Sequence, residues 1–260
     1  MSQELLVNIT PQETRVAVLD NGSVQEIHIE RLRSRGLVGN IYLGEVSRVL
    51  PGMQAAFIEA GLQRTAFLHA SDINAGQAVV DAAAAREQPP IQQLLREQQR
   101  IMVQVLKDPI GSKGARLTTQ IAIPSRYLVL LVDNPGVGVS ARIEGSAERE
   151  RLRGVGLSLL GEESPNGCIL RTAAEGVSEA ALIRDWAFLQ RLWAAVRERA
   201  GEAQPATMLH EDLPLMLRVL RDLVSDEVER VRIDSREWHE RMIAFSEAFL
   251  PDARSRLEHY

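Results

Sequence analysis

The chain has 260 residues, of which 45% are hydrophobic, 25% charged and 4% aromatic, as in an ordinary soluble globular protein of one or two domains. Its formal net charge of −5 excludes a protein that coats nucleic acid through overall positive charge, although it allows a local basic patch. The longest apolar run, 127–132, is far shorter than the roughly 20 residues of a membrane-spanning helix. A single cysteine, Cys168, excludes an internal disulfide. We therefore expect a cytoplasmic protein with no membrane segment.

The first 36 residues predict a meander of three β-strands. Asn21 and Gly22 tolerate the positive φ of a type I′ turn, so they predict a tight hairpin. Residues 31–36 predict a charged linker after the last strand. The expected strands cover 5–9, 15–19 and 24–30.

The next segment predicts a small β-barrel, because five short strands have glycines at their bends. The strands are expected at 40–46, 55–60, 64–70, 100–108 and 115–123. An Ala-rich stretch and two adjacent prolines interrupt the pattern over 74–99. This interruption predicts a mobile insertion at a loop tip, with a short helix near 91–96.

From residue 127 onward, strands alternate with helices that have apolar positions on one face. Ser178 and Ser235 stand where the N-caps of two of these helices are expected. Residues 202–207 predict a linker. The expected strands cover 127–133, 136–140, 168–172 and 228–233, and the expected helices cover 146–160, 178–200, a stretch from about 212, and 235–249.

Two phenylalanines form the first candidate site. A three-residue loop at 61–63 places Phe57 directly opposite Phe67 on neighbouring strands of the predicted barrel. In barrels of the OB type, such rings stack on the bases of single-stranded nucleic acid. The alternative is a pair of core phenylalanines, since phenylalanine is usually buried.

A basic segment forms the second candidate site. The two lysines of the chain, Lys107 and Lys113, lie with Arg116 in one glycine-containing segment that joins two strands of the barrel. The glycines let the backbone approach a phosphate closely. Alone, the segment is as consistent with an ordinary solvated turn. Next to two aromatic rings, it is typical of a surface for single-stranded nucleic acid.

The third candidate site follows a predicted strand. Arg171 and Thr172 precede a loop of small residues and the helix that Ser178 caps. A guanidinium, a hydroxyl and free amides at a helix start suit a phosphate. The glycine spacing and the lysine of a P-loop are absent. The alternative is a strand-end arginine that pairs with a carboxylate.

We find no catalytic constellation in the sequence. The five histidines are scattered without metal-ligand spacing, and Cys168 is better interpreted as a buried strand residue. No cluster of carboxylates follows apolar strands in the way that holds two Mg²⁺ ions. The residues alone therefore indicate a binding protein with no visible catalytic site.

Several stretches closely resemble the N-terminal part of the bacterial ribonuclease E/G family, and its ribonuclease G branch more than its ribonuclease E branch. The resemblance covers nearly the whole chain apart from 74–99 and parts of the later helices. The similar stretches include ELLVN at 4–8, QEIHIER at 25–31, VGNIY at 38–42, AFLHASDI at 66–73, KGARLTT at 113–119, PSRYLV at 124–129 and RTAAEG at 171–176.

The resemblance implies an α+β architecture of several subdomains. An RNase H-like subdomain, made of residues 1–36 and 212–260, would be split around two inserted parts. The first inserted part is an S1 domain, an OB-type barrel, at 37–122. The second is an α/β 5′-sensor region at 123–205.

The resemblance also implies a function and its residues. Members of the family cut single-stranded RNA endonucleolytically and prefer a 5′-monophosphate end, in 16S rRNA precursor maturation and mRNA decay. Phe57, Phe67 and Lys113 match RNA-contacting residues of the S1 domain, and Lys107 joins them from the basic segment. Four further positions match the 5′-phosphate pocket, although Ser125 stands where the ribonuclease E branch has glycine: Arg171, Thr172, Val129 and Ser125.

In the family, the aspartates that bind Mg²⁺ and the cysteines that hold a structural Zn²⁺ between protomers lie C-terminal to the resembling part. We therefore expect this chain to bind neither metal and to be inactive alone, while the full-length family protein is a homo-oligomer. An alternative function is a non-catalytic S1-type RNA-binding module that acts with ribosomes or as a regulator. Such a module has no need of Arg171 and Thr172. A scaffold that docks protein through the helices of 212–260 is a third hypothesis.

Overall fold

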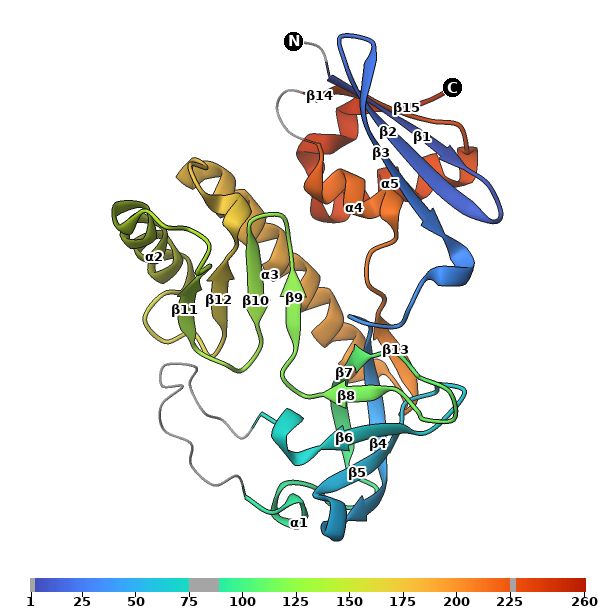
Figure 1. Ribbon diagram of the computed structural model, residues 1–260, viewed down its shortest axis with the longest axis vertical. Coiled ribbons are helices and arrows are strands. Elements are labelled where there is room, and N and C mark those ends of the chain that lie inside the picture. Colours follow the sequence, from blue (N-terminus) through green and yellow to red (C-terminus); the bar gives the residue numbers. More distant parts are fainter. Residues whose placement is uncertain (1–2, 75–88, 225–227) are drawn as a thin grey trace. The chain divides into compact units, whose positions relative to one another are not determined.

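The computed structural model describes residues 3–74, 89–224 and 228–260, which form two compact units. One unit combines Met1–Gly36 with Leu213–Tyr260, and the other is Leu37–Asp212. Figure 1 shows both with their element labels. None of the described helices is long and apolar enough to cross a membrane.

The first unit is built on a five-stranded sheet in the order β15-β14-β1-β2-β3. The central strand β1 is parallel to β14 and antiparallel to β2. Asn21 and Gly22 have φ of 47° and 80°, so the predicted hairpin turn is confirmed, as is the meander. The strands are β1 (Gln3–Ile9), β2 (Glu13–Asp20), β3 (Ser23–Arg31), β14 (Val228–Ile233) and β15 (Leu257–His259).

Two helices cover one face of this sheet, α4 (Leu215–Asp222) and α5 (Arg236–Phe249) (Figure 1). Leu5, Val7 and Val231 on the sheet form a core with apolar side chains of both helices. The helix expected from about 212 begins only at Leu215, because Pro214 stands at its N-cap with extended backbone. Short 3₁₀ turns complete the unit, η1 (Leu32–Ser34) within the predicted linker and η5 (Pro251–Arg256) before β15.

The second unit contains a closed five-stranded barrel, as predicted and consistent with an OB-type fold. Its strands run in the order β4-β5-β6-β8-β7, and pairing of β4 with β7 closes it. Val46, Ile58, Leu68, Val103 and Leu117 fill its interior. The strands are β4 (Ile41–Leu50), β5 (Ala55–Glu59), β6 (Ala66–His69), β7 (Arg100–Lys107) and β8 (Arg116–Thr118), with 3₁₀ turns η2 (Pro51–Met53) and η3 (Ala70–Asp72).

Part of the predicted mobile insertion is packed against the barrel. Helix α1 (Ile91–Leu94) is shorter than expected, and Ile91 and Leu95 are buried in the barrel core. The N–H of Ile91 donates to Oε1 of Gln54 at 3.0 Å. The segment 89–99 is therefore not a loop tip, because two apolar side chains anchor it. Residues 75–88 of the insertion lie outside the described residues.

A four-stranded sheet in the order β11-β12-β10-β9 stands beside the barrel, with helices α2 and α3 packed on it. A further strand, β13, pairs with β4 of the barrel, directly after the predicted linker. The elements are β9 (Ala122–Pro124), β10 (Leu128–Leu131), β11 (Gly136–Val139), α2 (Ser146–Leu160), β12 (Gly167–Leu170), η4 (Thr172–Ala174), α3 (Glu179–Glu202) and β13 (Thr207–His210).

The strand expected at 115–123 is wrong, because the chain bends in its middle and supplies β8 to the barrel and β9 to the sheet. The hydroxyl of Thr118 accepts from the N–H of Gln120 at 3.0 Å and stabilises the bend. Gln104 of β7 joins the two parts. Its side-chain amide accepts from the N–H of Ala122 at 2.9 Å and donates to the carbonyls of Ala122 and Gly39 at 3.0 and 2.9 Å.

We predict that Gln104→Leu lowers the free energy of unfolding by about 1–3 kcal/mol, because it leaves partly buried backbone groups of Gly39 and Ala122 without the partners that Gln104 gives them. Urea denaturation followed by circular dichroism measures the change. Gln120→Leu, at an exposed position, is the matched control and stays near wild type. An unchanged urea midpoint for Gln104→Leu would show that Gln104 does not hold barrel and sheet together.

Candidate nucleic-acid interface

The outer face of strands β5 and β6 carries two phenylalanine rings side by side. Phe57 pairs with Phe67 across the ladder, as the loop length predicts. Their chain neighbours point into the barrel and are fully buried, whereas both phenylalanines stay partly exposed. The ring centroids are 6.3 Å apart and the ring planes meet at 69°, an edge-to-face arrangement. The rings are therefore surface groups of the barrel and not part of its core.

A row of side chains crosses the barrel through these rings. Arg48 on β4 pairs with Phe57, Arg116 on β8 pairs with Phe67, and Lys107 on β7 pairs with Arg116. Because ladder partners project from the same face of a sheet, the aromatic pair lies between cations. We call this set of five side chains the barrel row: Arg48, Phe57, Phe67, Arg116 and Lys107.

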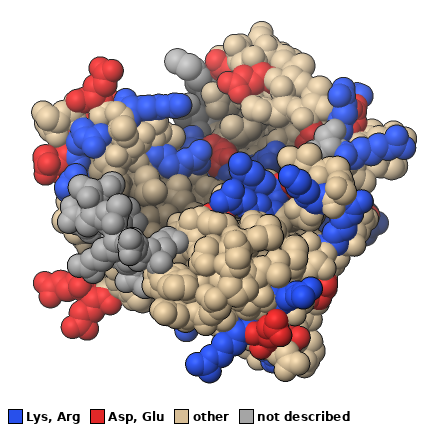
Figure 2. Space-filling view, turned by 60° about the horizontal axis from the view of Figure 1, so that its bottom comes forward, with Lys and Arg blue, Asp and Glu red and all other residues tan. Residues whose placement is uncertain are grey.

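The cations of this surface differ in how their charge is compensated. Arg116 donates from Nε and Nη2 to the two carboxylate oxygens of Asp72 at 2.8 and 3.1 Å, and these hydrogen bonds raise its pKa. Lys107 and Lys113 are exposed and make no ion pair within the part of the chain that the structure describes. Figure 2 shows one face of the molecule, on which basic side chains gather beside a broad area without charge. The lysine charges are therefore available to an anionic partner.

The basic segment that contains Lys107 and Lys113 lies against β6, the strand that carries Phe67. The N–H of Phe67 donates to the carbonyl of Ala115 at 2.8 Å, and Arg64 donates to the carbonyl of Gly111. A Cβ on Gly114 would stand 2.0 Å from the carbonyl oxygen of Thr65, so only glycine allows this approach. The loop holds Lys113 at the edge of the strand next to the aromatic pair.

His69, which the sequence did not single out as a site residue, extends the aromatic surface. Its ring centroid lies 6.4 Å from that of Phe67, and the two planes are inclined by 32°. Nδ1 accepts from the N–H of Ser71 at 3.2 Å and lies 2.7 Å from its hydroxyl, which fixes the ring orientation. Because side chains alternate along a strand, the spacing of two residues from Phe67 places His69 on the same face.

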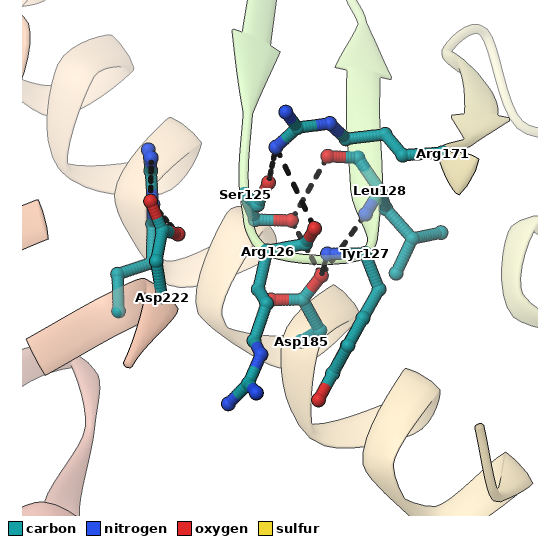
Figure 3. A network of polar contacts seen from close by, with 8 residues as sticks. Ser125, Arg126, Tyr127, Leu128, Arg171, Asp185 and Asp222 are labelled. Carbon is teal, nitrogen blue, oxygen red and sulfur yellow. Dashed lines mark hydrogen bonds and ion pairs between the residues drawn. The ribbon is translucent and has the colours of Figure 1, made fainter. Parts of the chain in front are cut away.

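At the end of β12, the guanidinium of Arg171 is held by neutral groups. Its Nη1 donates to the carbonyl of Ser125 and, at 3.5 Å, to that of Arg126 (Figure 3). Arg171 is exposed and has no carboxylate partner within the described residues. The carbonyls orient the side chain but leave its charge uncompensated, in contrast to the ion pair that was the alternative interpretation.

Thr172 is the next residue, and its hydroxyl is positioned by the loop that follows β11. Its hydroxyl lies 3.0 Å from the hydroxyl of Ser140, just after β11. Nη1 of Arg149 on α2 donates to the carbonyls of Ser140 and Ile143 at 2.7 and 3.2 Å. Helix α2 therefore holds the loop that contains Ser140, and Ser140 in turn orients the hydroxyl of Thr172. This hydroxyl and the guanidinium of Arg171 form an exposed pair of hydrogen-bond donors.

The other two residues of the predicted phosphate pocket lie deeper. Ser125 is fully buried, and its hydroxyl donates to the carboxylate of Asp185 at 2.6 Å. Its carbonyl, not its hydroxyl, faces Arg171. Val129 lies on β10, between β9 and β12 of the sheet. The structure thus brings Ser125 and Arg171 together through the backbone.

An ion pair on α2 fixes the loop that leads to α3. The carboxylate of Glu148 accepts hydrogen bonds from Nε and Nη2 of Arg151 at 2.7 Å each and from the N–H of Gly176 at 2.9 Å. These hydrogen bonds lower the pKa of Glu148 to about 2. Arg151 also donates to the carbonyl of Val177 at 3.1 Å. The carboxylate is therefore ionised at neutral pH and ties the loop after Thr172 to α2.

In the described part of the chain, the remaining titratable groups include no cluster for a metal ion and one buried thiol. Among the described residues, no three or more His, Cys, Asp or Glu side chains stand close enough together to hold a metal ion. Cys168 lies buried on β12, and burial raises the pKa of its thiol to about 12. Its interpretation as a buried strand residue is confirmed.

Comparison with known proteins agrees with this geometry. The model of the ribonuclease E/G family matches residues 122–260. The chain is 52% identical to ribonuclease G of Escherichia coli over its whole length and 45% identical to ribonuclease G of Haemophilus influenzae over 99% of it. It is also 38% identical to ribonuclease E of a Nostoc species over 87% of the chain. The chain belongs to the ribonuclease E/G family, as the resemblance predicts.

The relatives are longer than this chain. It covers 53% of the Escherichia coli protein, 52% of the Haemophilus influenzae protein and 32% of the Nostoc protein. The chain therefore spans about half the length of the ribonuclease G relatives that it matches.

Proposed function

We propose that this chain is the RNA-recognition portion of a ribonuclease G-like endoribonuclease that acts on single-stranded RNA with a 5′-monophosphate end. The observation that carries the proposal is the pair Phe57 and Phe67, which stands outside a closed OB-type barrel between cations. The high identity to ribonucleases G across the whole chain supports the same function.

On the barrel, the aromatic pair binds the bases of an RNA strand, and the lysines bind its phosphates. Bases stack on the rings of Phe57 and Phe67, and His69 offers a third ring. The backbone phosphates lie near Lys107 and Lys113, whose charges have no carboxylate partner within the described residues. None of these groups distinguishes one base from another by hydrogen bonding, so we expect little sequence preference.

At the end of β12, Arg171 and Thr172 bind the 5′-terminal phosphate. A guanidinium grips two phosphate oxygens at once, and a hydroxyl donates to a third. Both groups are exposed and already oriented by the backbone of Ser125 and by Ser140. We assign no direct contact to the buried hydroxyl of Ser125, and Val129 belongs to the pocket only through its backbone.

Within this proposal, the sheet and helices over 123–205 are the 5′-sensor region, and the barrel at 37–122 is the S1 domain. The unit formed by 1–36 and 213–260 is an RNase H-like subdomain. The RNA partners are rRNA precursor and mRNA in the cytoplasm, and the full-length protein is a homo-oligomer. The similarity to ribonucleases over the whole chain favours this function over a free-standing S1 module.

The metals expected for the family, Mg²⁺ and Zn²⁺, do not fit the described residues. These residues hold no cluster of His, Cys, Asp or Glu side chains of the kind that binds a metal ion. We therefore derive no reaction step through a metal on this chain, whose own residues bind and orient the RNA.

We predict that Phe57→Ala and Phe67→Ala each weaken binding of single-stranded RNA by about 1–3 kcal/mol, because each removes a stacking platform. Fluorescence anisotropy with a labelled oligonucleotide measures the affinity. Phe249→Ala is the matched control, because Phe249 also belongs to a partly buried ring pair, with Phe245 on α5. If both variants keep wild-type affinity after correction for the folded fraction, the rings are not the RNA-binding surface.

We predict that the wild-type chain prefers a 5′-monophosphate RNA over the same RNA with a 5′-hydroxyl by about tenfold or more, because a charge-assisted hydrogen bond is worth about 1.5–3 kcal/mol. Arg171→Ala removes this preference. Arg153→Ala, at an exposed position on α2, is the control that keeps it. Equal affinity for both ends in the wild type would exclude a phosphate pocket here.

We predict that residues 1–260 bind RNA without cutting it, because no group of side chains is present among the described residues to hold Mg²⁺ against the scissile phosphate. Incubation of the purified chain with end-labelled RNA and Mg²⁺, followed by gel electrophoresis, tests this. Cleavage that copurifies with the chain through successive columns would contradict it.

A further inference from the structure

Asp185 on α3 holds the turn between β9 and β10 from below. Its Oδ2 accepts from the hydroxyl of Ser125 at 2.6 Å and from the N–H groups of Tyr127 and Leu128 at 2.8 and 3.1 Å (Figure 3). Successive N–H groups that converge on one anion form a backbone nest, which fixes the conformation of the turn.

The opposite side of the same turn carries Arg171. The carbonyls of Ser125 and Arg126 accept from its guanidinium, and its own N–H donates to the carbonyl of Tyr127 at 2.8 Å. The turn therefore receives a carboxylate on its N–H side and a guanidinium on its carbonyl side. Asp185 and Arg171 form no direct ion pair with each other.

One peptide group connects these charges. The peptide group between Arg126 and Tyr127 donates its N–H to Asp185 at 2.8 Å and offers its oxygen to Arg171 at 3.5 Å. The carbonyl of Ser125, one residue earlier in the turn, is the other acceptor of the guanidinium. The linking peptide dipole thus points its negative end at the guanidinium, and hydrogen bonds in such a chain polarise one another. A direct ion pair would neutralise the charge of Arg171, whereas the carbonyl oxygens of the turn orient the guanidinium and leave its charge uncompensated.

We propose, on the basis of the function proposed above, that Asp185 is the positioning residue of the 5′-phosphate pocket and presents Arg171 to the RNA end through the 125–128 turn. It contacts no RNA. Without the carboxylate, the peptide groups are free to rotate, and the guanidinium loses the carbonyls that aim it. The selectivity for a 5′-monophosphate then falls, while the affinity of the barrel for the rest of the strand stays.

The test measures the affinities of the wild type, Arg171→Ala, Asp185→Ala and Asp185→Asn for one short RNA with a 5′-monophosphate and with a 5′-hydroxyl. Asp185→Ala is expected to lower the ratio of the two affinities by at least about fivefold, with the 5′-hydroxyl affinity unchanged within about twofold. Asp185→Asn, which keeps an acceptor but not the charge, is expected to lie between. Arg199→Ala is the matched control, because Arg199 on the same helix likewise binds the backbone of another segment, at the carbonyl of Leu209 at 2.6 Å.

The outcomes separate this inference from the function on which it rests. A wild-type chain that binds the 5′-monophosphate and the 5′-hydroxyl RNA equally well overturns both the proposed function and the role of Asp185. A preference that Arg171→Ala removes, but that both Asp185 variants retain, overturns the role of Asp185 alone.

Amide hydrogen exchange gives a second measurement that needs no RNA. Faster exchange at residues 127, 128 and 171 in Asp185→Asn supports the role, and unchanged exchange there contradicts it. If Asp185→Ala does not fold, the affinity ratio of Asp185→Asn decides, and a wild-type ratio overturns the proposal.

Discussion

The aromatic surface of the barrel depends on which way two short strands face. In β5 and β6, small and aliphatic side chains point inward and are fully buried: Ala56, Ile58, Ala66 and Leu68. Since side chains alternate along a strand, Phe57 and Phe67 must then point outward. A shift of one residue in this pairing would turn one strand over, which buries its ring and exposes its core residues. The register therefore decides whether the barrel has an aromatic surface at all.

The two arginines at the proposed contact surfaces show how the same side chain serves different purposes. Arg116 is compensated by the carboxylate of Asp72, so it supports the barrel row and contributes little net charge to it. Arg171 is held by carbonyl oxygens and keeps its charge for an anion. A peptide oxygen orients a guanidinium without neutralising it, which is what a phosphate pocket needs before its ligand arrives. The counter-charge, Asp185, is one peptide group further away.

Local patterns predicted much of this fold. The alternation of the first strands, the Asn21–Gly22 turn and the pairing of Phe57 with Phe67 all follow from spacings of a few residues. The residues themselves indicated a phosphate site at Arg171 and Thr172, and the resemblance supplied the family and added Val129 and Ser125 to that site.

What local patterns could not predict depends on distant partners. The run 115–123 has continuous strand character, and it is divided where Thr118 stabilises a bend and Gln104 binds Ala122 from another strand. The segment 89–99 looked like part of a loop, yet Ile91 and Leu95 find space in the barrel core. Asp185 is one acidic residue on an amphipathic helix, and its partners lie 57 to 60 positions away in the chain. Only His69 had a local signal, its spacing from Phe67.

The central claim is that the barrel row binds the strand and the end of β12 binds its terminal phosphate. The most direct measurement is a pair of NMR titrations of the isotopically labelled chain with one short RNA, with and without the 5′-monophosphate. The account predicts that both RNAs shift the signals of Phe57, Phe67 and Lys113, and that only the phosphorylated RNA shifts those of Arg171, Thr172 and Ser140. Identical shifts with the two RNAs, or a barrel surface that neither RNA perturbs, would contradict it.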